Sequence, residues 1–485
     1  GLNAGSWSTA LSRPPAEDSH TTRETVPKMA IDTGDTAFMF VCTGLVQFMT
    51  PGLAFFYGGL VRSTNILTIM LQNFASMGFV FILWWAVLFS MSFGTTLNGI
   101  LGDPQSYYLF NNVPMTRELS TAFPDIPGVL FAGYQGMFAV ITPALMTGAF
   151  ADRVKIVPYV LFVTLWMFLI YAPVCHWVWG GGWMQKWGVW DFAGGIVVHI
   201  TSGFSALASL MVIGPRSKPA DDPEALSQPH NVPFVALGTA MLWFGWFGFN
   251  GGSALASNSV AVMAMMNSQL AGSMGLVGWI IMDMANGKKP GLVGACVGAV
   301  AGLATVTPAA GYITMGGAFV IGLTASIVCY FCVMTIQKAE LDDALDVWGV
   351  HGMGGFTGTL LVGVLADRTV NPGTVERSFH QFYVQASCAC ICAAYSFILS
   401  YILLTFLDVT VGIRPKRSHE GDLDMTQTGE QAYITHRSSE NLIEDGAASD
   451  DDSDTTTEDF ESATAKKGKV TPRRPVDSTR ELRAA

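Results

Sequence analysis

Long apolar runs alternate with short polar connections along most of this chain. A helix needs about 20 apolar residues to cross the hydrocarbon core of a bilayer. Runs of this kind are expected near residues 35–60, 66–93, 127–150, 155–176, 191–213, 232–253, 258–285, 291–307, 311–336, 346–366 and 380–408. The pattern predicts an all-α polytopic membrane protein with eleven transmembrane helices in a domain spanning residues 31–410.

The two ends of the chain are polar. Residues 1–30 hold no long apolar core, so no signal peptide is visible, and we expect an extracellular segment. After residue 410 we expect a cytoplasmic tail, with a regulatory segment at 411–433 and a disordered part at 434–485. Residues 440–461 carry ten acids and no Lys or Arg, and phosphorylation of Ser453 or Thr455–Thr457 is a hypothesis for this part.

Composition supports a membrane protein and excludes other classes. Only 13% of the residues are charged and 50% are hydrophobic, whereas soluble proteins carry about 25% charged residues. We therefore expect neither an enzyme nor a nucleic-acid-binding protein. The eight cysteines lie in or beside apolar runs, which argues against a disulfide framework. The run Cys388-x-Cys-x-Cys392 would fan its thiols around a helix, so we expect no metal and no cofactor.

Basic residues indicate the orientation. Lys and Arg gather in alternate connections, and such loops face the cytoplasm. The richer set holds eleven, namely Arg62, Arg153, Lys155, Arg216, Lys218, Lys288, Lys289, Lys338, Arg414, Lys416 and Arg417. The other set holds Arg117, Lys186, Arg368 and Arg377. This bias predicts an extracellular N-terminus and a cytoplasmic C-terminus.

The two halves of the domain echo each other. Phe55-Phe-Tyr-Gly-Gly59 in the first expected span resembles Phe247-Gly-Phe-Asn-Gly-Gly252 in the sixth. Asp191 and His199 in the fifth span have an apparent counterpart in Asp346 and His351 in the tenth. A displacement of five spans reverses direction, so we expect an inverted five-helix repeat with a substrate path between the repeats.

His199 and His351 are ionisable rings within apolar segments. Such side chains usually face a protein interior or a pore. Because their spans enter from opposite sides, the two rings are expected to meet near the midplane. They could form a hydrogen-bonding rail or relay a proton. Two buried structural histidines, or a pair of haem ligands, are the alternatives.

Aromatic side chains gather on the expected outer side. Tyr134, Phe138, Trp179, Trp246 and Phe249 form this group, and the hydroxyl of Ser253 is close in sequence. An interfacial belt or core packing would explain them. A cation–π cage for a small cation is the functional interpretation, with Trp179 as its best candidate.

Asp191 and Asp346 stand near expected helix starts. There a carboxylate accepts backbone N–H groups and interacts favourably with the helix dipole. Helix capping is the main interpretation for both acids. For Asp191, holding a cation in the outer mouth remains open.

Several motifs together resemble the ammonium transporter (Amt/Mep/Rh) family. They are Asp191-Phe-Ala-Gly-Gly-Ile-Val-Val-His199, Gly245-Trp-Phe-Gly-Phe-Asn-Gly-Gly-Ser253, Asp346-Val-Trp-Gly-Val-His351-Gly, Tyr134-Gln-Gly-Met-Phe138, Val178-Trp-Gly-Gly-Gly182 and Val306-Thr-Pro308. The resemblance runs from about residue 35 to 433 and favours the Amt branch. It implies a homotrimer in the plasma membrane, with one pore in each subunit, that takes up ammonium and accepts methylammonium.

The resemblance also implies site roles. Trp179, Phe138 and Ser253 match an outer ammonium-recruitment site, and Asp191 matches its essential acid. Phe138 and Phe249 match a phenylalanine gate, and His199 and His351 match a twin-histidine pore pair. Supporting positions are Tyr134, Trp246, Asn250, Thr307 and Asp346.

This sequence departs from the family pattern in places. Tyr134 stands where phenylalanine is common, and Thr428 replaces a usual histidine in the tail. Thr426 matches a position that a kinase phosphorylates in plant members. The resemblance leaves open whether NH₄⁺ or NH₃ crosses. An ammonium sensor that signals through its cytoplasmic tail is the alternative function.

Overall fold

The computed structural model describes residues 31–116, 119, 125–217, 228–373 and 377–433. The expectations for residues 1–30 and 434–485, including Ser453 and Thr455–Thr457, lie outside them.

The first half of the described chain is almost entirely helical. Its elements are α1 (Thr33–Leu60), a continuous helical run of α2 (Ile66–Ala75), η2 (Ser76–Val80), α3 (Phe81–Leu83), η3 (Trp84–Leu88) and α4 (Phe89–Phe93), then η4 (Tyr108–Phe110) and α5 (Gly128–Phe150). They continue with α6 (Ile156–Trp166), η5 (Met167–Tyr171), α7 (Ala172–Trp179), α8 (Trp183–Trp187), η6 (Gly195–Ile200) and α9 (Thr201–Ile213). Strands β1 (Thr96–Leu97) and β2 (Leu101–Gly102) form a small antiparallel hairpin that pairs Thr96 with Gly102.

The second half consists of further helices. These are α10 (Val232–Gly252), α11 (Ser259–Ala285), α12 (Leu292–Val306), α13 (Met315–Lys338), η8 (Trp348–Gly352), α14 (Met353–Leu365), α15 (Phe379–Thr410), η9 (Arg417–His419) and α16 (Leu423–Gln427). Polar side chains cap several helix starts and accept backbone N–H groups there, as expected for N-caps. They are Asp32, Asn231, Asn258, Thr314 and Ser378.

Nine of the described helices are long and apolar enough to cross a membrane. The other two expected spans contain shorter helices. One is the 15-residue helix α12, and the other is η8 followed by the 13-residue helix α14. The apolar pattern therefore located the helical segments, while the number of crossings stays a prediction.

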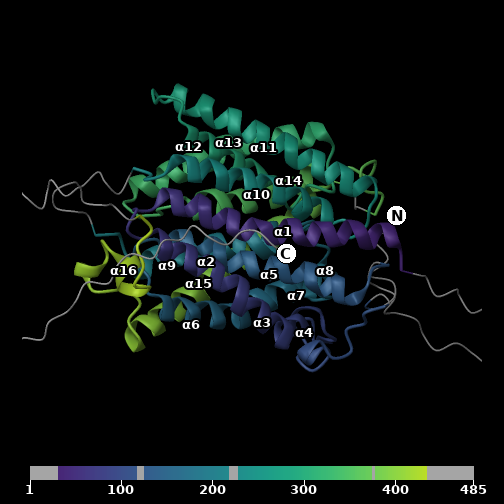
Figure 1. The fold of residues 1–485 in the computed structure, drawn as a ribbon. Coiled ribbons are helices and arrows are strands. Elements are labelled where there is room, and N and C mark those ends of the chain that lie inside the picture. Colours follow the sequence, from purple (N-terminus) through teal and green to yellow (C-terminus); the bar gives the residue numbers. More distant parts are fainter. Residues whose placement is uncertain (1–30, 117–118, 120–124, 218–227, 374–376, 434–485) are drawn as a thin grey trace, which may run out of the picture. The chain divides into compact units, whose positions relative to one another are not determined.

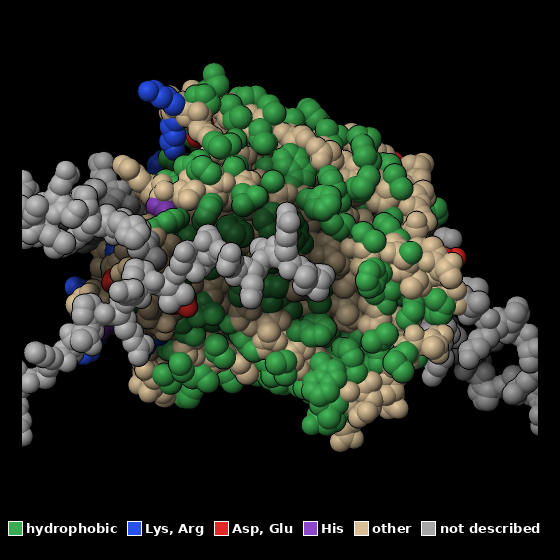
Figure 2. All heavy atoms as spheres, in the orientation of Figure 1, with side chains coloured by type: hydrophobic (Ala, Val, Ile, Leu, Met, Phe, Trp, Pro, Cys, Tyr) green, Lys and Arg blue, Asp and Glu red, His purple; other side chains and the backbone are tan. Residues whose placement is uncertain are grey.

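The long helices run side by side along one common direction (Figure 1). Helix α1 packs along α10, and α11, α12 and α13 pack against one another. Hydrophobic side chains cover much of the flank in view, and Lys and Arg side chains are seen toward the end where α16 lies (Figure 2). This arrangement suits a helix bundle whose flank faces lipid.

Two spans begin with a π-helical turn. The turn η6 leads into α9 and carries His199, and the turn η8 leads into α14 and carries His351. Such turns are rare and often occur at functional sites. Here the same irregular geometry introduces both histidines.

Candidate functional site

The two histidines are in direct contact. His199 Nδ1 and His351 Nδ1 are 3.3 Å apart, and the ring centroids are separated by 5.2 Å with an interplanar angle of 20°. Both rings are buried. The contact depends on a close approach of their spans, because a Cβ on Gly203 would overlap the backbone of Gly352.

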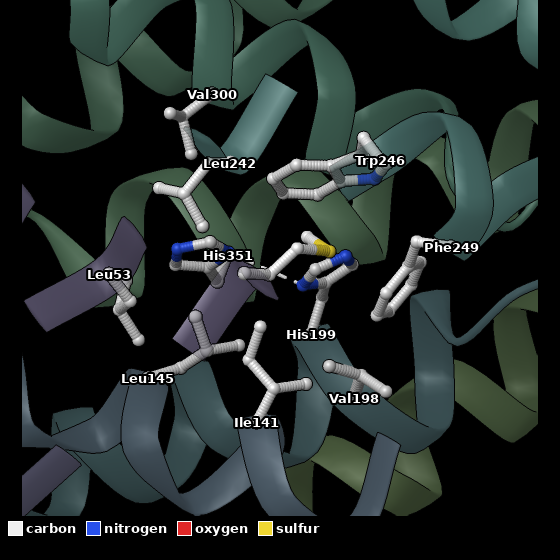
Figure 3. A pocket seen from close by; sticks show the side chains of 11 residues that line it. Leu53, Ile141, Leu145, Val198, His199, Leu242, Trp246, Phe249, Val300 and His351 are labelled. Atoms are coloured by element: carbon white, nitrogen blue, oxygen red, sulfur yellow. Dashed lines mark hydrogen bonds between the residues drawn. The ribbon is translucent and has the colours of Figure 1, made fainter. Parts of the chain in front are cut away.

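A narrow apolar cavity surrounds the histidine pair (Figure 3). It encloses about 10 Å³, close to the space that one water molecule needs. Its lining residues are Met49, Leu53, Ile141, Leu145, Val198, His199, Leu242, Trp246, Phe249, Val300 and His351. The two imidazoles therefore supply most of the hydrogen-bonding atoms in an otherwise hydrocarbon-lined space.

Aromatic rings lie beside the cavity, next to His199. The rings of Phe138 and Phe249 are 4.3 Å apart with an interplanar angle of 35°. The ring of His199 lies 6.2 Å from that of Phe249 and 5.8 Å from that of Trp246. Phe138 and Phe249 thus form a closely packed, tilted pair next to His199, and both are buried.

Trp179 and Ser253 lie beside this pair. The Trp179 ring meets the Phe138 ring edge-on at 5.9 Å. The Ser253 hydroxyl donates to the Phe249 carbonyl at 2.8 Å. The structure therefore gathers the expected aromatic and hydroxyl groups around Phe138 and Phe249.

The Asp191 carboxylate caps the start of the helical turn η6, which carries His199. Its carboxylate accepts N–H groups from Gly194, Gly195, Ile196 and Val197 at 2.6 to 3.1 Å, and Asp191 is only 5% exposed. Its backbone carbonyl accepts the indole N–H of Trp179 at 2.8 Å. This geometry is that of a helix cap, and it also ties the cap to Trp179.

The expected cap at Asp346 is replaced by one at Asp343. Asp343 Oδ2 accepts the N–H of Trp348 at 2.9 Å, whereas the described chain shows no side-chain hydrogen bond for Asp346, whose φ is 55°. Asp191 stands eight residues before His199, and Asp343 stands eight residues before His351. Each carboxylate also accepts an N–H five residues ahead. That spacing was visible in the sequence and identifies Asp343 as the counterpart of Asp191.

The remaining supporting residues brace the cavity wall. The Trp246 indole donates to the Thr307 hydroxyl at 2.9 Å, and that hydroxyl donates to the Leu303 carbonyl. Asn250 donates to the Ser268 hydroxyl at 2.8 Å. Trp246 lines the cavity directly, whereas Thr307 and Asn250 hold neighbouring helices together.

Gln385 supports the Asp191 turn, and sequence reasoning did not identify it. This fully buried amide in α15 accepts the N–H of Trp190 at 2.8 Å and donates to the Trp190 carbonyl at 2.7 Å. It also donates to the Thr359 carbonyl at 3.1 Å. A buried amide in an apolar span was the only available signal, since its partner is nearly 200 residues away in the chain.

Charged groups link several loops at the end of the bundle where α16 lies. The Arg216 guanidinium donates two hydrogen bonds to the Asp342 carboxylate, from Nε and Nη2, each at 2.9 Å. Burial raises the pKa of Asp342, but the hydrogen bonds and charge of Arg216 outweigh burial and hold this pKa at about 2. The adjacent Asp343 is buried, and burial raises its pKa to about 6.

The C-terminal segment packs against the same end. The Asp424 carboxylate accepts the N–H groups of Leu67 and Thr68 at the start of α2, at 2.9 and 2.7 Å. The Tyr433 hydroxyl lies 3.0 Å from His230 Nε2. Thr426 is exposed, and its hydroxyl donates to the Asp422 carbonyl at 2.9 Å. The segment that carries Thr426 therefore contacts the loops between the spans.

Known proteins are similar to this chain in both sequence and fold. The model of the Ammonium Transporter Family matches residues 37–433. Ammonium transporter Amt1 of Archaeoglobus fulgidus is 41% identical over 403 residues, which cover 82% of this chain and 99% of that protein. Ammonium transporter 1 of Dictyostelium discoideum is 39% identical over 417 residues, which cover 84% and 88% of the two chains.

Solved structures agree with these relatives. Saccharomyces cerevisiae Mep2 superposes with a TM-score of 0.74 at 30% identity, covering 84% of this chain and 94% of that one. A structure described as a Sensor Amt Protein superposes with a TM-score of 0.73 at 28% identity, covering 81% and 98%. With a family match across most of its length and transporters as relatives, this chain belongs to the Ammonium Transporter Family of membrane proteins.

Proposed function

We propose that this protein recruits NH₄⁺ at an outer site and passes NH₃ or NH₄⁺ through the cavity around His199 and His351. The observation that carries the proposal is the apolar cavity in which two contacting imidazoles supply the polar atoms. A hydrocarbon-lined bore disfavours hydrated ions. A histidine pair within it offers a small N–H compound partners along the way.

Recruitment is assigned to the groups around Phe138. Trp179 and Phe138 offer ring faces to a cation, Ser253 offers a hydroxyl oxygen, and Asp191 holds the Trp179 indole through its carbonyl. The paired rings of Phe138 and Phe249 act as the gate between this outer site and the histidines.

The membrane arrangement belongs to the same proposal. The eleven helical segments cross the membrane, with the N-terminus outside and the C-terminal tail in the cytoplasm. Support comes from the bias of basic loops and from the inverted repeat that Asp191–His199 and Asp343–His351 outline. A homotrimer in the plasma membrane follows from the family resemblance.

An ammonium sensor is the second candidate. The similarity to a Sensor Amt Protein favours it, and so does the packing of the C-terminal segment against the loops. Deleting residues 434–485 separates the two functions. A transporter keeps its flux, whereas a sensor keeps ammonium binding and loses its cellular response.

The central test measures ammonium flux in proteoliposomes and growth rescue of cells that lack ammonium uptake. We expect wild type to transport ammonium and methylammonium, and Trp179→Ala to raise KM about tenfold through the lost cation–π contact. Trp187→Ala is the matched control, because its ring stacks on Trp183 in α8 outside the site. If wild type moves neither ion at any concentration, the proposed function is wrong.

A further inference from the structure

Tyr134 contacts both gate residues, through the ring of Phe138 and the backbone carbonyl of Phe249. It lies on α5 four residues before Phe138, which puts both side chains on one helix face. Its ring meets the Phe138 ring at 5.0 Å with an interplanar angle of 66°. Its hydroxyl reaches across to α10, where the carbonyls of Phe249 and Gly248 lie 2.8 and 2.9 Å away. The whole side chain is buried.

The carbonyl that Tyr134 binds is not satisfied in the regular helical manner. In an α-helix the N–H of Ser253 would donate to the carbonyl of Phe249. Here that N–H turns to Asn250 at 3.2 Å because α10 ends. The Phe249 carbonyl instead accepts hydrogen bonds from the hydroxyls of Tyr134 and Ser253, each at 2.8 Å.

The site for the tyrosine hydroxyl is built into α10. A Cβ on Gly252 would lie 2.7 Å from Tyr134 Oη and 2.8 Å from Cys42 Cβ. Only glycine at this position leaves room for the hydroxyl without a rearrangement. The Ser253 hydroxyl is also 3.3 Å from Tyr134 Oη, so the recruitment and gate residues share one hydrogen-bonded cluster.

We propose that Tyr134 is a positioning residue that tethers α5 to the end of α10 and thereby sets the separation of Phe138 and Phe249. This tether determines how strictly the gate discriminates ammonium from the larger methylammonium. The proposal rests on the proposed function, because it assumes that these ions pass the gate. It adds a specificity determinant whose hydroxyl acts through the gate residues Phe138 and Phe249.

Tyr134→Phe tests the tether, because it keeps the ring and removes only the hydroxyl. Tyr159→Phe is the matched control. Tyr159 is equally buried, and its hydroxyl bonds to another serine, Ser76, at 2.5 Å, away from the cavity. For Tyr134→Phe we expect the kcat/KM ratio of methylammonium to ammonium to rise about threefold or more, through one lost hydrogen bond. For Tyr159→Phe we expect no change in that ratio.

Hydrogen exchange provides a readout that does not depend on transport. The amides of Ser253, Ala254 and Leu255 close the end of α10, and Tyr134→Phe should accelerate their exchange about fivefold. Tyr159→Phe should leave them unchanged. Faster exchange in a protein that moves no ammonium would reject the proposed function and retain the tether. Unchanged exchange, or an unchanged selectivity ratio in a transporting protein, would overturn the role of Tyr134.

Discussion

His199 Nδ1 faces His351 Nδ1 at 3.3 Å, so one ring donates and the other accepts. A neutral imidazole has one N–H and one bare nitrogen, so the two rings hold opposite tautomers at this contact. We expect His199→Ala and His351→Ala each to lower ammonium flux about tenfold, through lost hydrogen bonding in the bore. Because the rings act as a unit, the double variant should lose little more than either single one. Fully additive losses would contradict a shared role, and unchanged flux and selectivity in His199→Ala would reject it.

Asp191→Asn distinguishes a cap from a cation-binding group. The carboxylate accepts four backbone N–H groups, and a single amide oxygen cannot replace it. We expect Asn to destabilise the folded protein by about 2–4 kcal/mol, measured as a lower melting temperature in detergent, with impaired flux. A variant that melts like wild type but no longer transports would instead assign Asp191 a direct electrostatic role toward the ion.

Gln385→Leu should weaken the recruitment of ammonium, because Gln385 supports the recruitment site through Trp190. The amide clamps both backbone polar groups of Trp190, next to the carbonyl that holds the Trp179 indole. We expect KM to rise about fivefold or more while kcat changes less, because one or two buried hydrogen bonds are lost. Gln269→Leu is a control, since its amide donates to Ser273 within the same helix. Equal KM values for wild type and Gln385→Leu would argue against this brace.

Asp343→Asn should weaken the pH dependence of stability between pH 4 and 6. Burial raises the pKa of Asp343 to about 6, from an ordinary value of 3.8. The folded state therefore holds this proton more tightly than the unfolded chain, and the resulting stability is lost as the pH rises through 6. The charges around it are those of Arg153, Asp342 and Asp346. Asparagine can still accept the Trp348 N–H, so the melting temperature of the variant should fall less steeply between pH 4 and 6 than that of wild type.

Asp342→Asn is the control for this experiment. The pKa of Asp342 is held at about 2, so its contribution is complete above pH 4 and is lost only as the pH falls through 2. This variant should be less stable than wild type throughout the window, with the wild-type slope retained. A wild-type slope that persists in Asp343→Asn would show that another group titrates.

The sequence located the histidines well because topology alone constrains them. The predicted topology has their spans enter from opposite faces, and on that basis we expected the two rings to meet. The structure brings His199 and His351 together. The cap at Asp343 was missed because Asp346 lies closer to the motif. The equal eight-residue spacings from Asp191 and Asp343 carried the information.

Tertiary braces could not be predicted in this way. Gln385 and Trp190 are far apart in the sequence, and no periodicity relates them. The hydroxyl of Tyr134 likewise finds its carbonyl only because α10 ends at Gly252 and frees it. Such contacts depend on where one helix ends against another, which apolar patterns locate only to within a few residues.

Thr426→Asp should lower ammonium flux by loosening the contact between the C-terminal segment and α2. Thr426 stands two residues after Asp424, whose carboxylate accepts the N–H groups of Leu67 and Thr68. A phosphate at Thr426 would carry about −1.5 to −2 charges close to Asp422 and Asp424, and it would replace the hydroxyl that donates to the Asp422 carbonyl. We expect the aspartate variant to exchange the Leu67 and Thr68 amides faster and to lose flux about fivefold or more, since two charge-assisted hydrogen bonds weaken.

Thr426→Ala should transport like wild type, because it adds no charge. Thr410→Asp, at the exposed last residue of α15 and beyond the expected span, controls for a charge elsewhere. Wild-type flux in Thr426→Asp, with unchanged exchange at α2, would exclude this residue as a switch.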